Sequence, residues 1–145
     1  NSQATKGLLA PIDRHRYYLT DKVFLSQKDI RQLQLAKSAM ASGIATLLSL
    51  AGRSVGELQH VVIGGSFGYH LNARHLQRIG LLPQEYCGPI SFVGNTSLAG
   101  ASLALLNNSI LRDLKHVAST IRVVELGSQP DFSKRFITGL DFGPS

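Results

Sequence analysis

Two short stretches of this chain join buried-strand residues to glycine in a way that suits contact with a ligand. They are residues 61–68 (VVIGGSFG) and residues 91–101 (SFVGNTSLAGA). In open α/β sheets, ligands lie beyond the carboxyl ends of the strands, where glycine lets another group approach the backbone and the next helix offers free N–H groups. Short glycine motifs are also common in turns, and spacing alone favours a simple turn at Gly64 and Gly65.

Several other chemistries do not fit the residues. The glycine stretches match neither a Walker loop nor a G-x-G-x-x-G fingerprint, and the DFG at residues 141–143 stands without the rest of a kinase signature. A single cysteine, Cys87, can neither close an internal disulfide nor hold an iron–sulfur cluster. His70 and His75 are five residues apart, off the spacing of a helical zinc pair. We therefore expect no metal site.

Composition limits the class of protein. With 145 residues, 43% of them hydrophobic, the chain predicts one globular domain. No apolar run approaches the roughly 20 residues of a membrane span, so we expect neither a membrane protein nor a membrane partner. The net charge of +6 is spread from Lys6 to Arg135, so we expect no nucleic-acid partner. The absence of an initiator Met and of a signal pattern suggests the edge of a longer chain.

The first half of the chain predicts a hairpin or a bent strand entry, followed by a long helix. Two β-like runs, residues 17–19 and 22–25, flank a Thr-Asp pair. Ser26 and Asp29 form a capping box, and the helix that they open ends at Gly52. Apolar residues recur along it at three- and four-residue spacing, which predicts one buried face. These residues are Ile30, Leu33, Ala36, Met40, Ile44, Leu47 and Ala51.

The second half alternates strands with helices. Strands are predicted at residues 61–63, 90–93 and 121–126, the first of them covered on both sides. Helical patterns occupy residues 72–79, 98–117 and 131–137, with Asn72 as the cap of the first and Gly80 and Pro83 closing it. This alternation predicts an α/β fold with a largely parallel sheet flanked by helices.

Five motifs then carry a family resemblance. LSQKDIRQLQLAKSAMASGI, VVIGGSFGYHLN, IGLLP, VGNTSLAGASLALL and PDFSKRFI resemble, in this order, the carboxy-terminal part of the reductive activators of corrinoid proteins. The resemblance covers roughly residues 19–142. It implies an RNase H-like lobe of the actin–Hsp70–sugar kinase (ASKHA) fold, with ATP as the ligand.

The family also implies a division of labour. Its members are similar in carrying an N-terminal [2Fe–2S] domain, a linker and two RNase H-like lobes around an ATP cleft, and they use ATP to reduce a Co(II) corrinoid to Co(I). This sequence has neither the four-cysteine motif nor the phosphate loop of the first lobe. We therefore expect residues 1–145 to be one domain, the second lobe of a cytoplasmic protein. Mg²⁺ and catalysis would require the missing first lobe, so no catalytic residue is assigned here. The expected partners are that lobe and a corrinoid protein.

By resemblance, the backbone at Gly64 and Gly65 packs against the adenosine of ATP. The Ser66 hydroxyl either reaches the ribose or base or caps the turn. Asn95 or the threonine after it caps the next helix, and Asn95 is also kept as a candidate nucleotide contact.

The long helix is expected to form the other wall of the site. Gln34, Lys37, Ser38 and Ala41 follow i, i+3, i+4, i+7 spacing and share one face. The resemblance implies that this face approaches adenine and ribose, with Lys37 as its polar contact. The alternative for Lys37 is an ordinary surface lysine lying along the helix.

Two other functions stay open from the sequence. The same fold serves activators of other low-potential enzymes, such as dehydratases, which also couple ATP to electron transfer. A protein-docking module that binds no nucleotide belongs to a different class.

Overall fold

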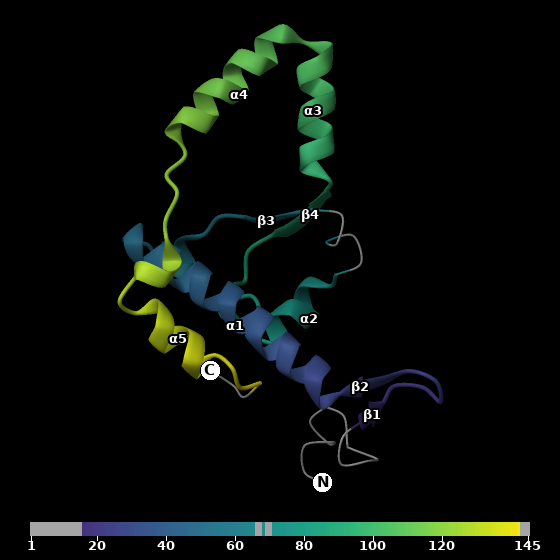
Figure 1. The fold of residues 1–145 in the computed structure, drawn as a ribbon. Coiled ribbons are helices and arrows are strands. Elements are labelled where there is room, and N and C mark those ends of the chain that lie inside the picture. The colour runs from purple at the N-terminus through teal and green to yellow at the C-terminus, as the bar shows by residue number, and fades with distance from the viewer. Residues whose placement is uncertain (1–15, 66–67, 69–70, 143–145) are drawn as a thin grey trace.

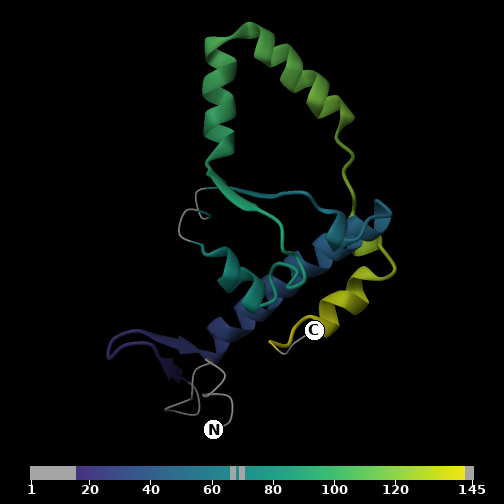
Figure 2. The same ribbon diagram turned by 180° about the vertical axis from the view of Figure 1, so that it is seen from behind.

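The computed structural model describes residues 16–65, 68 and 71–142 (Figure 1). A long helix, α1 (Gln27–Leu50), crosses the body of the molecule, and the short helix α5 (Phe132–Thr138) packs beside it. The strands β3 (Val61–Gly64) and β4 (Ile90–Gly94) form a parallel pair, with α2 (Ala73–Arg78) between them in the chain. Two further helices, α3 (Thr96–Leu106) and α4 (Asn108–Thr120), rise from the body as an arch (Figures 1 and 2).

The beginning of α1 follows the prediction. The strands β1 (Arg16–Tyr18) and β2 (Phe24–Ser26) pair as an antiparallel hairpin. The Ser26 hydroxyl then accepts a hydrogen bond from the Asp29 N–H (3.2 Å), while the Asp29 carboxylate accepts one from the Ser26 N–H (2.9 Å). Hydrogen bonds from the Ser26 side chain and backbone hold the pKa of Asp29 below its usual value. The hairpin and the capping box are confirmed.

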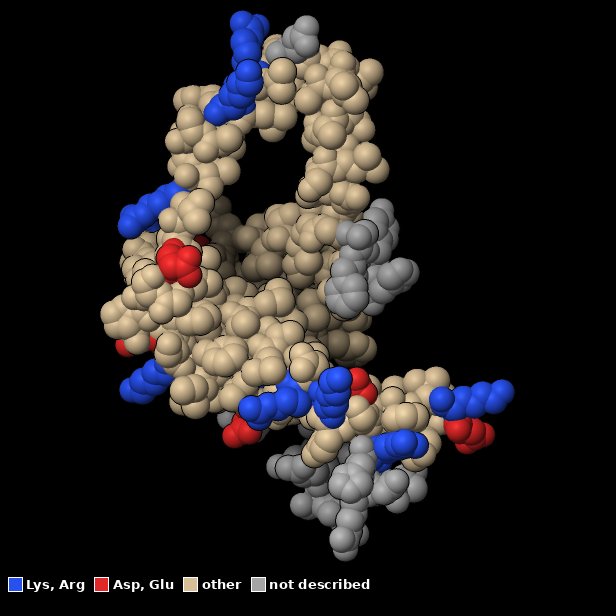
Figure 3. All heavy atoms as spheres, in the orientation of Figure 1, with Lys and Arg blue, Asp and Glu red and all other residues tan. Residues whose placement is uncertain are grey.

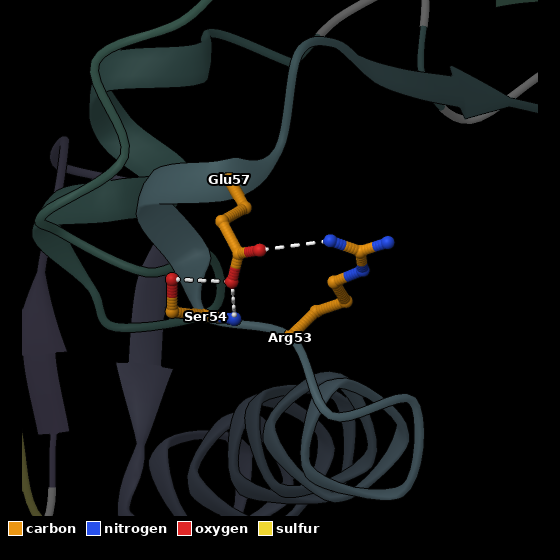
Figure 4. Close-up of polar contacts among 3 residues, drawn as sticks. All are labelled: Arg53, Ser54 and Glu57. Carbon is orange, nitrogen blue, oxygen red and sulfur yellow. Dashed lines mark hydrogen bonds and ion pairs between the residues drawn. The ribbon is translucent and has the colours of Figure 1, made fainter.

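The end of α1 is closed by glycine and by a second small capping box. Gly52 has φ +62°, and the Arg53 N–H bonds back to the Leu48 carbonyl at 2.9 Å, which ends the helix as predicted. In the 3-10 turn η2 (Val55–Glu57), the Glu57 carboxylate accepts from the Ser54 N–H and hydroxyl and pairs with Arg53 at 2.9 Å (Figure 4). These bonds lower the pKa of Glu57, and they fix the turn that leads the chain from α1 to β3.

The predicted burial of α1 is wrong. Its buried residues are Lys37, Ser38, Ser42, Gly43 and Thr46. The apolar stripe instead faces outward, and Leu33, Met40 and Leu47 are exposed. The polar face is buried because α5 and the segment after it cover it and offer backbone carbonyls to its side chains. Periodicity located the two faces of the helix but did not tell which one the rest of this chain covers.

The parallel pair is confirmed, but it is covered on one side only. Val61 pairs with Ile90 and Ile63 with Phe92, and a bulge follows before Gly64. Val62 and Val93 are exposed, contrary to the prediction of a strand buried on both faces. Among the described residues, no third strand pairs with β3 or β4.

The strand predicted at residues 121–126 is absent. These residues run as extended coil into the 3-10 turn η4 (Leu126–Ser128), and Val123 is 89% exposed. β-Branched residues favour a strand only where a neighbouring strand accepts their backbone hydrogen bonds and a surface packs against their side chains. No strand of the described residues pairs with this segment.

The helical pattern over residues 98–117 is divided at Asn107. Its side chain accepts a hydrogen bond from the Ser109 N–H at 2.9 Å and so caps α4. The two helices enclose an opening that stays visible when all atoms are drawn (Figure 3). Their apolar side chains are largely uncovered, and Leu105 is 88% exposed. Exposed apolar side chains gathered along two adjacent helices are uncommon on monomeric proteins.

The small apolar core lies under α2. Leu76, Leu82 and Tyr86 are its buried side chains among the described residues. The Gln77 amide donates to the carbonyls of Pro83 and Tyr86, which holds the loop between α2 and β4 against the helix. Asn72 caps α2 and Gly80, with φ +75°, follows its end, as predicted.

Among the described residues, α1 is long and apolar enough, by length and composition, to cross a membrane, contrary to the expectation that no apolar run approaches that length. Charged residues interrupt its apolar run. Core helices of globular proteins pass the same test, so one such helix does not by itself indicate a membrane span. In the view of Figure 3, Lys and Arg side chains are dispersed over the molecule rather than gathered in one patch.

Candidate functional site

The carboxyl ends of β3 and β4 meet through two glycines. The Gly65 N–H donates to the Gly94 carbonyl at 2.6 Å, and both residues have positive φ, +110° and +65°. This conformation is strained for any residue with a side chain. A Cβ built on Gly65 would meet no atom of the described residues within 4 Å, so the Cα side of Gly65 is open toward them. Its N–H and its carbonyl are both hydrogen-bonded, the carbonyl to the Gly68 N–H at 3.1 Å, so a ligand here would contact the Cα side. Ser66, the next candidate, lies outside the described residues.

Gly64 has a different reason to be glycine. A Cβ at this position would lie 3.2 Å from the Thr96 hydroxyl oxygen, so the missing side chain lets the start of α3 approach β3. Thr96 and Gly94 were not singled out as site residues from the sequence. The signal for both was present, because GNT follows the second strand as GGS follows the first.

Asn95 links the sheet end to α3. Its side-chain oxygen accepts a hydrogen bond from the Leu98 N–H at 3.0 Å, which confirms that it is the helix cap. Asn95 is exposed, and its side-chain amide nitrogen makes no hydrogen bond among the described residues. Asn95 thus keeps two donors that a ligand beside the glycines can use.

Lys37 on α1 is buried, so the alternative of an ordinary surface lysine is wrong. It is 4% exposed, its ammonium donates to the Asp141 carbonyl, and it lies over the Phe142 ring with 5.0 Å to the centroid. Burial lowers the pKa of Lys37, and the Asp141 carboxylate partly opposes that shift. The ammonium is held by the C-terminal segment rather than offered to solvent.

Ser38 is enclosed in the same contact. It is fully buried and donates its hydroxyl to the Phe136 carbonyl. A Cβ on Gly139 would lie 2.7 Å from its oxygen, so α5 approaches α1 closely because residue 139 is glycine. Gln34 and Ala41 are half-buried on the same helix. Ala41 lines an apolar pocket of about 210 Å³ between α1 and the loop after α2.

The predicted site residues therefore fall into two groups. Gly64, Gly65 and Asn95 lie together at the end of the parallel strands. Lys37 and Ser38 lie together under α5 and the residues after it. Contact of the two groups with one ligand stays a prediction. No group of three or more potential metal ligands occurs among the described residues.

A protein-family comparison matches residues 3–144 with the C-terminal domain of RACo, the ASKHA domain. The chain belongs to this family. Its α/β architecture, with a parallel strand pair and flanking helices, is the ASKHA fold that the sequence predicted.

The individual relatives agree with the family. The chain is 31% identical to the corrinoid activation enzyme RamQ of Eubacterium limosum over 83% of its length. It is 30% identical, over 67% of its length, to the [Co(II) methylated amine-specific corrinoid protein] reductase of Methanosarcina barkeri. A solved structure titled reductive activator for corrinoid, iron–sulfur protein superposes with a TM-score of 0.75 at 32% identity, covering 81% of this chain. In each case the chain spans only about a fifth of the relative, namely 20%, 18% and 19%.

Proposed function

We propose that this chain is the nucleotide-binding lobe of a longer protein that reductively activates corrinoid proteins. The observation that carries the proposal is the pair of hydrogen-bonded glycines with positive φ at the end of β3 and β4. The Cα side of Gly65 meets no described atom within 4 Å, at the end of the strands where ligands of α/β sheets bind. Membership of the ASKHA family supports ATP as that ligand.

In this proposal, the Gly64–Gly65 backbone lies against the adenosine. The free amide of Asn95 donates to the ribose or base, and Ser66 is retained as a candidate for the same role. The α1 face with Gln34 and Ala41 forms the opposite wall. Lys37 and Ser38 belong to that wall as well, although α5 and the segment after it cover them in the structure described here.

The remainder of the machinery is proposed to lie elsewhere in a longer cytoplasmic chain. The uncovered apolar stripe of α1, with Leu33, Met40 and Leu47, and the uncovered arch support a first lobe that packs on residues 1–145. The matched relatives are about five times longer, which leaves room for that lobe and for further domains. Mg²⁺ would then be bound with the help of the first lobe. The described residues supply no cluster ligands, so a [2Fe–2S] centre would also be held outside this chain.

The expected activity of the longer protein is ATP-dependent reduction of a Co(II) corrinoid protein to the Co(I) state. The names of the relatives refer to corrinoid proteins, which favours reduction of a corrinoid protein over activation of a dehydratase. The open glycine backbone favours a nucleotide site over a docking module without one.

The test uses the full-length protein and isothermal calorimetry with ATP. Asn95→Asp keeps a side-chain oxygen for the α3 cap but replaces the free amide with a carboxylate, so it should fold normally and bind ATP more weakly. Gly100→Ala, on α3 where an added Cβ meets nothing within 4 Å, is the control and should bind as the parent does. The proposal fails if the parent binds no ATP. Failure of the parent to reduce a Co(II) corrinoid protein, followed by its visible spectrum, would remove the assigned activity.

A further inference from the structure

The ammonium of Lys37 is enclosed by the end of this chain. It donates to the Asp141 carbonyl, it faces the Phe142 ring, and the backbone of Gly80 passes close to it, with a Cβ there 3.7 Å from the nitrogen. At 4% exposure, the side chain has no room for a ligand oxygen while these contacts persist. Any nucleotide that uses this part of α1 must first displace Asp141 and Phe142.

The contacts that enclose Lys37 are few, and they come from a short segment. Helix α5 has seven residues, and among the described residues beyond it Asp141 and Phe142 hold Lys37 through one carbonyl and one aromatic ring. Asp141 is exposed and Phe142 is only half-buried, so little apolar area is lost when they leave. The Ser38 hydroxyl anchors the preceding turn through the Phe136 carbonyl, which keeps α5 in place when the residues after it move. Residues 140–142 therefore cover Lys37 through contacts that can break while α5 stays in place.

We infer that Lys37 is a latch that couples nucleotide binding to release of the C-terminal segment, an inference that rests on the nucleotide function proposed above. In the latched state, the ammonium holds Asp141 and Phe142 over α1. In the nucleotide-bound state, the same ammonium turns to oxygen atoms of the nucleotide, and the segment is freed. At 4% exposure the ammonium has no room for a nucleotide oxygen while Asp141 and Phe142 enclose it, so each event weakens the other by the same factor.

The experiment measures ATP affinity and amide hydrogen exchange in the same set of full-length variants. Phe142→Ala removes the ring from the latch and should tighten ATP binding by about threefold to tenfold, the range expected for losing one cation–π contact. Phe24→Ala removes the ring of another cation–π pair, with Arg16, whose guanidinium carbon lies 4.5 Å from the ring centroid, and should leave the affinity unchanged. In the parent, ATP should speed exchange at the amide of Leu140, which donates to the Ile137 carbonyl, and should leave that of Gly139, which donates to the Arg135 carbonyl within the last turn of α5, unchanged.

Lys37→Met separates the latch from simpler roles, with the exposed Lys28→Ala on the same helix as its control. A latch predicts two effects together: ATP binding weaker than that of Phe142→Ala, in which the latch is already released, and fast exchange at Leu140 even without ATP. Faster exchange with the affinity of Phe142→Ala would mean a purely structural lysine, and weaker binding than the parent with unchanged exchange a purely nucleotide-binding one. Either result overturns the inference while the proposed function stands. If the parent binds no ATP, the inference and the proposed function are both refuted.

Discussion

Gly65→Ala and Gly100→Ala form a matched pair that tests how the end of β3 is built. At both positions an added Cβ would meet no atom within 4 Å, so neither change creates a steric clash. They differ in backbone conformation, because Gly65 has φ +110° whereas Gly100 lies inside helix α3. The sign of each effect on stability should therefore follow from the backbone alone.

The magnitudes follow from that difference. A side chain at the φ of Gly65 adds strain of about 1–3 kcal/mol, against which the lower entropy of the unfolded chain returns about 0.4–1 kcal/mol. We expect a net loss of about 1–2 kcal/mol. Alanine in place of Gly100 should instead stabilise the helix by about 0.5–1 kcal/mol.

Urea unfolding of the two variants and the parent, followed by circular dichroism, measures both changes in the free energy of unfolding. With a slope of about 1–3 kcal/mol per molar urea, the midpoint should fall by several tenths of a molar for Gly65→Ala. It should rise by a smaller amount for Gly100→Ala. A Gly65→Ala midpoint equal to or above that of the parent would refute the assigned backbone strain. Equal decreases for both variants would show that the conformational argument does not explain either glycine.

Four other predictions concern the cap of α3, stability at low pH, the outer face of α1 and catalysis. Asn95→Ala should cost about 1 kcal/mol of unfolding free energy through loss of the α3 cap, and the Asn95→Asp variant, which still caps, should not. The pKa of Asp29 is lowered in the folded state, so its contribution is present above its ordinary pKa and is lost as the pH falls through the lowered value. Below about pH 4 the stability gap between the parent and Asp29→Asn should therefore close, as urea midpoints across pH would show. Met40→Gln should leave the melting temperature of residues 1–145 nearly unchanged, because Met40 is 52% exposed, but should lower that of the full-length protein if a first lobe covers this face. Residues 1–145 alone should fold without hydrolysing ATP, and steady phosphate release from the purified chain would contradict the assignment of one lobe.

Much of the local structure could be predicted because it depends on neighbouring residues. The Ser26–Asp29 capping box, the stop at Gly52 and the cap at Asn72 involve atoms a few residues apart, so residue type and spacing determine them. The parallel pairing of β3 with β4 followed from two apolar runs separated by a helix. The glycines at the ends of these strands were found in the same way, and contact of Gly65 with a ligand stays a prediction.

The predictions that were wrong concern features that depend on contacts between distant parts of the chain. Residues 121–126 have β propensity, yet no described strand lies beside them to accept their hydrogen bonds. The periodicity of α1 gave two faces correctly, but the covered face is the polar one, because carbonyls of Phe136 and Asp141 about a hundred residues later satisfy Ser38 and Lys37. The sequence by itself determined the helix, its caps and the glycine strand ends, since those are local. Only the tertiary structure decided that Lys37 is enclosed by the end of the chain, because burial depends on which distant segment arrives to cover a face.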